Sequence, residues 1–320
     1  MPDHLESSLF SLIVPLFNEE ENIPELMRRI PLALDTLGFT AWELILISDG
    51  SRDRTNEMIS EIARKDPRVT AVLLSRNFGH QAAVSTGLTI ARGSAIAIID
   101  GDLQDPPEAL RLLVQALRDG FDVAYGVREH RKENIFKRAA YFSFYRVLKR
   151  VAEIDIPLDT GDFCGMRRCV LDAMLQLPEK NRFLRGLRAW VGFQQVGVPY
   201  EREPRFAGRP KYTFIKLVRL AMDGLFAFSG LPVRVMQGLG FCVSLLSIFT
   251  AIGYLIWYFV NPAAFPRSFA TLVISIWYLG GVQLFFMGML GEYVVRTCEE
   301  SRGRPVAVIA KTIRATDSNT

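Results

Sequence analysis

Apolar runs alternate with amphipathic stretches over the first third of the chain. The apolar runs cover residues 9–16, 43–47 and 69–74, and helical periodicity covers residues 23–37, 55–65 and 81–91. Strands and helices that alternate at this spacing predict an α/β fold, in which helices cover both faces of a mostly parallel sheet. Ligands of such sheets bind beyond the carboxyl ends of the strands.

Polar side chains follow the predicted strands. Glu19 comes shortly after the first run, Asp49 follows the second, and a further apolar run at residues 96–99 ends in Asp100 and Asp102. Because these strands are expected to be parallel, the groups that follow them should meet at one edge of the sheet. We therefore expect the functional site at that edge.

The stretch DGDLQDPPE, residues 100–108, predicts a metal and diphosphate site. In an extended backbone, residues i and i+2 face the same way, so Asp100 and Asp102 can converge on one cation while Gly101 lets the chain bend. Carboxylates suit Mg²⁺ or Mn²⁺, which take further ligands from substrate phosphates. An ordinary Asp-Gly turn is the alternative. Because no glycine-rich phosphate loop is present, a metal and basic side chains would have to hold the diphosphate.

Several ordered motifs resemble the family 2 glycosyltransferases of GT-A fold, a Rossmann-like α/β architecture. They are VPLFNEEENI (14–23), ISDGSRDRT (47–55), LSRNFGHQAAVSTGL (74–88) and IDGDLQDPPE (99–108). Two more, TGDFCGMRR (160–168) and RFAGRPKYTF (205–214), are similar to those of dolichyl-phosphate mannose synthase. With two hydrophobic stretches at the C-terminus, the chain most resembles the bacterial polyprenyl-phosphate glucosyltransferases of the GtrB group. The resemblance runs from about residue 11 to residue 304.

The resemblance implies a donor site. Asp100 and Asp102 would form the DxD motif, with Asp102 as the direct metal ligand and Gln104 as an additional one. A capping role at the N-terminus of the following helix is the alternative for Asp49. The positions that match the nucleoside pocket are Pro15, Phe17, Glu19, Asp49 and Asp100.

The resemblance also implies a lipid monophosphate as acceptor, held by basic side chains. Asp162 matches an aspartate near the reacting centre, with Asp159 as the rival candidate. The chain departs from the family pattern at Phe142 and Pro210, where serine is usual, and at Cys164, where arginine is usual. The bases that we assign to the diphosphate or acceptor phosphate are Arg128, Lys137, Arg138, Arg205 and Lys211.

Two uncharged stretches near the C-terminus, residues 235–260 and 268–291, contain 26 and 24 residues. Each exceeds the roughly 20 residues that a helix needs to cross a bilayer core, which predicts two transmembrane helices; a buried core helix is the alternative for each. Arginines precede the first stretch and follow the second, whereas the loop between them has only Arg267. The positive-inside rule therefore predicts a multi-pass protein of the inner membrane with its catalytic domain in the cytoplasm.

We divide the chain accordingly into a catalytic domain (1–210), an amphipathic juxtamembrane region (211–232), two transmembrane helices (233–296) and a cytoplasmic C-terminal tail (297–320). The segments 212–228 and 136–151 mix bases with aromatic or aliphatic side chains, which is typical of helices at a lipid surface. A helix packed on the catalytic domain is the alternative for both.

Composition excludes other classes. The net charge of +4 is modest and contains no dense basic run, so we expect no nucleic-acid partner. The four cysteines lack metal or disulfide spacing, which favours a reducing compartment. We expect no signal peptide, because residues 9–16 are short and lack a basic leader. A homo-oligomer is compatible with the sequence.

These features predict an inverting, metal-dependent enzyme that moves glucose from UDP-glucose to a polyprenyl (undecaprenyl) phosphate at the cytoplasmic membrane face. The same reaction with GDP-mannose, UDP-N-acetylglucosamine or a UDP-amino-arabinose is the first alternative. A processive polysaccharide synthase fits less well, because two spans are few and Ala189 interrupts the Q/R-x-x-R-W signature. A non-enzymatic lipid-binding module would not require the carboxylates of the donor site.

Overall fold

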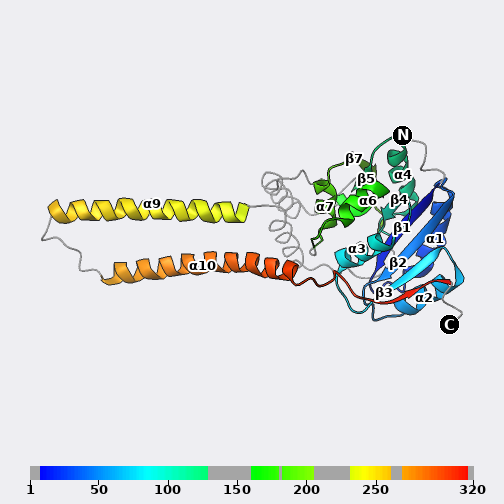
Figure 1. The fold of residues 1–320 in the computed structure, drawn as a ribbon, viewed down its shortest axis with the longest axis horizontal. Coiled ribbons are helices and arrows are strands. Elements are labelled where there is room, and N and C mark those ends of the chain that lie inside the picture. The colour runs from blue at the N-terminus through cyan, green and yellow to red at the C-terminus, as the bar shows by residue number, and fades with distance from the viewer. Residues whose placement is uncertain (1–7, 129–159, 180–181, 205–230, 261–268, 316–320) are drawn as a thin grey trace. The chain divides into compact units, whose positions relative to one another are not determined.

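The computed structural model describes residues 8–128, 160–179, 182–204, 231–260 and 269–315 (Figure 1). The chain forms two compact units. One unit contains residues 1–146, 154–214 and 304–320, and the other contains residues 147–153 and 215–303. The first unit is built on a sheet, whereas the described part of the second consists of two long helices.

Within the described residues, the sheet has eight strands in the order β7-β5-β6-β4-β1-β2-β3-β8. The centre, β4-β1-β2-β3, is parallel, and β5 is parallel to β7. Strand β6 runs antiparallel to both of its neighbours, and β8 runs antiparallel to β3. The strands are β1 (Leu9–Leu16), β2 (Ala41–Ser48), β3 (Val69–Leu74), β4 (Ala95–Ile98), β5 (Val123–Arg128), β6 (Thr160–Arg167), β7 (Gln195–Tyr200) and β8 (Ile309–Ile313).

Helices cover both faces of the sheet, as the sequence predicts. Alternate residues of β1 point to opposite faces: Leu12 belongs to the core that includes α1, α2 and α4, whereas Ile13 lies against Gly87 of α3. Helices α6 and α7 contact each other, and α6 contacts β4 and β6. The helices of this unit are α1 (Ile23–Asp35), α2 (Thr55–Lys65), α3 (His80–Ile90), α4 (Leu110–Arg118), α6 (Arg168–Leu175) and α7 (Leu184–Trp190), with the 3₁₀ turn η1 at Pro107–Ala109.

Strand β8 lies in the segment that we predicted to be a C-terminal tail. Ile313 is buried against the core and pairs with Ala71 of β3, while the N–H group of Ser75 donates to the carbonyl of Val308 at 2.9 Å. A short amphipathic strand of this kind is difficult to recognise in a sequence, because its partner is more than 200 residues away. The sheet unit therefore includes residues from both ends of the chain.

The second unit contains α9 (Leu231–Val260) and α10 (Phe269–Ser301), one helix for each stretch that we predicted to span a membrane (Figure 1). Large apolar side chains on both are exposed, such as Phe249 and Leu284. Within the described residues, Tyr278–Val295 is long and apolar enough to cross a bilayer. Insertion of the pair into a membrane stays a prediction. The loop 261–267 and the predicted interfacial segments 136–151 and 212–228 lie outside the described residues.

Candidate active site

The polar groups that follow the strands meet at one edge of the sheet, as predicted. Strand β6 contributes through its beginning, because it runs antiparallel to β4. Cys164 pairs with Ile98, so Asp162, two residues before Cys164, lies on the same side of the edge as Asp100, two residues after Ile98. The antiparallel register thus joins two carboxylates that are 62 positions apart in the sequence.

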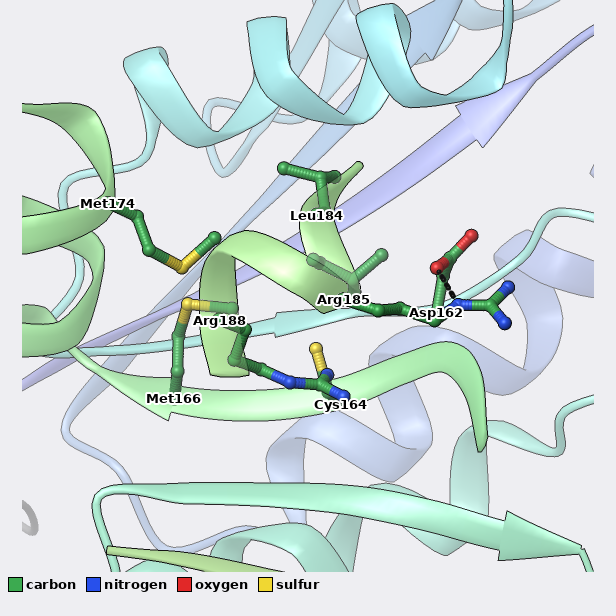
Figure 2. A pocket seen from close by; sticks show the side chains of 8 residues that line it. Asp162, Cys164, Met166, Met174, Leu184, Arg185 and Arg188 are labelled. Carbon is green, nitrogen blue, oxygen red and sulfur yellow. Dashed lines mark hydrogen bonds and ion pairs between the residues drawn. The ribbon is translucent and has the colours of Figure 1, made fainter. Parts of the chain in front are cut away.

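Among the described residues, Asp162 is a buried carboxylate with three side-chain donors, of which Figure 2 draws Arg185. Its Oδ1 accepts from Nε of Arg185 at 2.8 Å. Its Oδ2 lies 2.9 Å from Nε2 of His80 and accepts from Nε2 of Gln81 at 3.0 Å. Burial opposes the charge, but Arg185 and His80 outweigh burial and hold the pKa of Asp162 well below its usual value. Asp162 is therefore ionised at neutral pH.

His80 begins α3 and connects the two carboxylates. Its Nε2 lies 3.7 Å from Oδ1 of Asp100 as well as 2.9 Å from Oδ2 of Asp162. Burial lowers the pKa of His80, but the hydrogen bond with Asp162 and the charges of both aspartates outweigh burial and raise the pKa to about 9. The ring is therefore a cation at neutral pH, and its Nε2 donates to Asp162.

Asp100 has an unusually high pKa for a carboxylate. Burial, opposed by His80 and reinforced by the neighbouring aspartates, raises the pKa of Asp100 to about 6. Its Oδ1 is buried and has no hydrogen-bond partner in the part of the chain that the structure describes. A bound cation would satisfy such an oxygen, so this observation fits a metal site.

The rest of the loop supports that site. Asp102 is buried, and its Oδ1 accepts from the backbone N–H of Gln104 at 3.2 Å. A Cβ on Gly101 would lie 2.3 Å from Cδ2 of Leu16, so only glycine lets this loop pack so closely on β1. Within the described residues, no three His, Cys, Asp or Glu side chains gather closely enough to hold a metal by themselves. A cation here would therefore take further ligands from water or substrate phosphates.

Asp49 fastens the loop that precedes α3. Its two oxygens accept from the backbone N–H groups of Phe78 at 2.7 Å and Gly79 at 2.9 Å. Burial outweighs these hydrogen bonds and raises the pKa of Asp49. The alternative that Asp49 caps the next helix is wrong, because Asp53 accepts from the N–H of Thr55 at the start of α2. Gly50, with φ +64°, turns the chain after Asp49.

The segment after β1 is tied to the segment after β2 at the same edge. The N–H of Asn18 donates to Oγ of Ser51 at 3.0 Å, and the N–H of Glu19 donates to Oγ1 of Thr55 at 2.9 Å. Phe17 is half-buried there. These positions, with Pro15 at the end of β1, therefore lie beside Asp49, although no contact in the structure tests the nucleoside-binding roles that we predict for them.

Of the predicted phosphate-binding bases, the structure describes only Arg128. It ends β5 opposite Tyr200 of β7, and its Nη2 would lie 3.0 Å from a Cβ on Gly161. Its Nε is buried without a hydrogen-bond partner among the described residues. Arg128 is therefore close to the strand that carries Asp162. Lys137, Arg138, Arg205, Lys211 and the rival aspartate Asp159 lie outside the described residues.

A pocket of about 10 Å³ lies beside Asp162 (Figure 2), which is close to the room that one water molecule needs. It is too small for a sugar. Arg188 is almost completely buried beside it and lies over the ring of Tyr125 at 5.2 Å. The residues that line the pocket are Ile98, Asp162, Cys164, Met166, Met174, Leu184, Arg185 and Arg188.

Sequence reasoning gave no role to His80, Gln81 or Arg185. His80 and Gln81 fall inside a motif that we quoted, and Arg185 begins the interrupted R-x-x-R segment. The signal that was available is the placement of His80 and Gln81 shortly after a predicted strand, where ligands bind. The link between Asp162 and Arg185 could not be found in this way, because it depends on how α7 packs.

The chain is similar to a known protein family and to individual proteins of that family. Residues 11–175 match the family described as Glycosyl transferase family 2. An uncharacterized glycosyltransferase of Synechocystis is 42% identical over 301 residues, which cover 94% of each protein. The SfII prophage-derived bactoprenol glucosyl transferase of Shigella flexneri is 36% identical over 308 residues, covering 95% of this chain and 98% of that protein. Both relatives are thus similar over the sheet and over the two C-terminal helices.

Among solved structures, a mannosyltransferase of Pyrobaculum calidifontis in complex with GDP-Man and Mn²⁺ has a TM-score of 0.45 and 18% identity. The alignment covers 81% of this chain and 88% of that chain.

Proposed function

The chain belongs to glycosyl transferase family 2, and we propose that it moves glucose from UDP-glucose to a polyprenyl phosphate such as undecaprenyl phosphate. The products are polyprenyl-phosphate-glucose and UDP. One observation carries the proposal: relatives that are similar over nearly the whole chain are named bactoprenol glucosyl transferases. The reaction is a single displacement at C1 of the sugar, which inverts its configuration.

Asp100, Asp102 and Gln104 would hold Mg²⁺ or Mn²⁺. When bound, such a cation stabilises the negative charge that develops on the departing nucleoside diphosphate. Two observations support this role. Oδ1 of Asp100 is buried and has no hydrogen-bond partner among the described residues. The N–H of Gln104 donates to Asp102, which fixes the conformation of the loop.

Pro15, Phe17, Glu19 and Asp49 would form the nucleoside pocket. A carboxylate has about four acceptor sites, and within the described part of the chain Asp49 uses two of them, for Phe78 and Gly79. The remaining sites can accept from a base N–H or a ribose hydroxyl. Asp49 would then link the nucleoside to the start of α3.

Asp162 orients cations and does not remove a proton. Its low pKa and its three donors make it a poor base at neutral pH. The reaction does not require a base, because a phosphate monoester is already largely ionised at neutral pH. Its partners His80 and Arg185 would instead reduce the repulsion between the acceptor phosphate and the donor diphosphate.

Arg128, Lys137, Arg138, Arg205 and Lys211 would bind the acceptor phosphate or the diphosphate. A guanidinium fits a phosphate with two parallel hydrogen bonds, which favours arginine for this task. Among these bases, Arg128 has geometric support for binding phosphate. Its side chain, from β5, lies close to Gly161, which precedes Asp162 in β6.

The acceptor is a lipid, so the reaction would occur at a membrane. Helices α9 and α10 would anchor the enzyme in the inner membrane, with the catalytic unit in the cytoplasm, where nucleotide sugars are made. The arginine asymmetry around these helices supports that orientation.

A donor panel tests the proposal. The purified full-length protein, given undecaprenyl phosphate and Mn²⁺, should produce a radiolabelled glucosyl lipid and free UDP from UDP-glucose. We expect UDP-glucose to exceed GDP-mannose by at least about tenfold in kcat/KM, a margin of about 1.4 kcal/mol that one lost base contact can supply. Faster transfer from GDP-mannose or another nucleotide sugar would contradict the glucose assignment. Absence of transfer from every donor would contradict the proposed reaction.

A further inference from the structure

Asp105, the third aspartate of the loop after β4, is completely buried. Its Oδ1 accepts from the hydroxyl of Tyr200 at 2.6 Å and from Nε of Arg202 at 3.1 Å. Its Oδ2 is also buried but has no hydrogen-bond partner among the described residues. Burying a carboxylate oxygen without a donor is costly, so a donor from outside the described residues is expected at Oδ2.

Asp105 is held rigidly. The ring of Tyr200 packs against Phe163, the neighbour of Asp162, with ring centroids 5.0 Å apart. The carbonyl of Gln104 accepts from the N–H of Glu203 at 2.9 Å, which links the loop after β4 to the segment after β7. The contacts of Tyr200 with Asp105 and of Glu203 with Gln104 therefore fix the direction of Oδ2 of Asp105.

Arg29 of α1 also links the loop after β4 to the segment after β7. It forms an ion pair with Glu108, at the end of the loop. It forms a second ion pair with Glu203, in which Nη1 of Arg29 lies 3.0 Å from Oε2 of Glu203. These exposed pairs contribute little stability by themselves, but they limit movement of the loop relative to β7.

Asp105 lies close to the candidate metal ligands. It is five positions after Asp100 and three after Asp102, and its charge is among those that raise the pKa of Asp100. Oδ1 of Asp100 is likewise buried and unpartnered among the described residues. One loop thus contains two carboxylates with an unused oxygen. Asp105 does not join Asp100 and Asp102 in a set of three close enough to ligate one ion.

We propose that Asp105 is a positioning residue for the cation of the proposed function. Its Oδ2 accepts a hydrogen bond from a water bound to the cation that Asp100 and Asp102 hold. Tyr200 and Arg202 fix the direction of that oxygen. Water on a cation directs its hydrogens outward, so it supplies the donor that Oδ2 lacks among the described residues. Residues that orient a metal-bound group in this way contribute about 10- to 100-fold to metal affinity.

Mn²⁺ binding tests the inference without relying on transfer activity. The full-length protein in detergent is titrated with Mn²⁺ in the presence of UDP, and free Mn²⁺ is measured by electron paramagnetic resonance. Asp105→Asn keeps the shape of the side chain but replaces one carboxylate oxygen with a donor, so we expect the Kd for Mn²⁺ to rise about 10- to 100-fold. Asp172→Asn is the matched control, because Asp172 is exposed on α6 and its loss should leave the Kd unchanged.

Tyr200→Phe is the second variant. It keeps the ring that packs on Phe163 but removes the hydroxyl that orients Asp105, so we expect a smaller rise of the Kd in a protein whose metal-free thermal unfolding is close to that of the wild type. An unchanged Kd in a folded Asp105→Asn protein would overturn the inference. If Asp105→Asn does not fold, an unchanged Kd in Tyr200→Phe would overturn it instead.

The two proposals fail in different ways. Normal Mn²⁺ binding without glucosyl transfer would contradict the proposed function and leave the role of Asp105 intact. Wild-type protein that transfers glucose in chelator and binds no Mn²⁺ would overturn the role of Asp105.

Discussion

Asp162 gathers side chains from two helices at the edge of the sheet where the candidate site lies. Three side chains from α3 and α7 donate to it, and one of them, His80, also approaches Asp100. A buried carboxylate with this many donors stays ionised, and its charge holds the side chains of His80 and Arg185 in place. The chemistry of each residue at this site therefore depends on its neighbours more than on its type.

At the residue scale, Asp102→Ala tests the metal site. Because this carboxylate would hold the cation that neutralises the leaving diphosphate, we expect turnover to fall about a hundredfold or more. Turnover of radiolabelled lipid measures the effect, and a chelator should cause a similar loss in the wild type. The exposed Asp172→Ala is the control. Full activity in chelator would rule out the metal-dependent mechanism.

His80→Gln tests the ion pair through pH. The folded-state pKa of His80, about 9, is above its ordinary value of 6.5, so the stability that its charge contributes is complete below about pH 6.5 and is lost as the pH rises through 9. We expect the variant to unfold several degrees below the wild type at pH 6, and the difference to shrink by pH 9.5. Thermal unfolding in chelator measures this. A difference that does not change with pH would contradict the charged form of His80.

At the element scale, the antiparallel strands β6 and β8 bring distant parts of the sequence to the parallel centre of the sheet. Strand β6 brings Asp162 beside Asp100 through its register with β4. Strand β8 pairs with the outer edge of β3 and begins close to Ser75, at the start of the loop that Asp49 holds. Covering this edge also protects a row of backbone groups that could otherwise pair with another chain.

Two isoleucines of β8 provide a matched test of this strand. Ile313 is 3% exposed, whereas Ile309 is 41% exposed. We expect Ile313→Ala to lower the free energy of unfolding by about 2–4 kcal/mol, because it removes core contacts and leaves a cavity. Ile309→Ala should change it by less than about 0.5 kcal/mol. Thermal unfolding of both variants measures the difference, and equal effects would show that β8 does not belong to the core.

At the scale of the whole molecule, the chain combines a sheet unit that recruits its last strand from the C-terminus with a unit of two long apolar helices. Along the sequence, the helix pair lies between two parts of the sheet unit, residues 154–214 and 304–320. An even number of spans is consistent with this connection, which agrees with the arginine pattern.

Cysteine labelling tests the topology. In a protein without its four native cysteines, we expect a reagent that cannot cross the membrane to label Ala264→Cys in intact cells and not Ser318→Cys. Permeabilised cells, in which both should react, are the control. The reverse pattern would put the catalytic unit outside the cell, where it could not reach nucleotide sugars.

The sequence by itself determined the features that depend on local periodicity. Alternating apolar runs predicted the strands β1, β2 and β3 and the helices between them, and two long uncharged stretches predicted α9 and α10. It also identified Asp49, Asp100 and Asp102 as groups at strand ends, because a polar residue directly after a buried strand needs no knowledge of distant contacts.

Only the tertiary structure decided which distant groups meet. The antiparallel direction of β6, the packing of α7 on Asp162 and the pairing of β8 with β3 each join residues that are far apart in the sequence. The unusual pKa values of His80 and Asp100 follow from those contacts and from burial. Strand direction and helix packing are set by the burial of apolar surface over the whole domain, for which a single segment contains no signal.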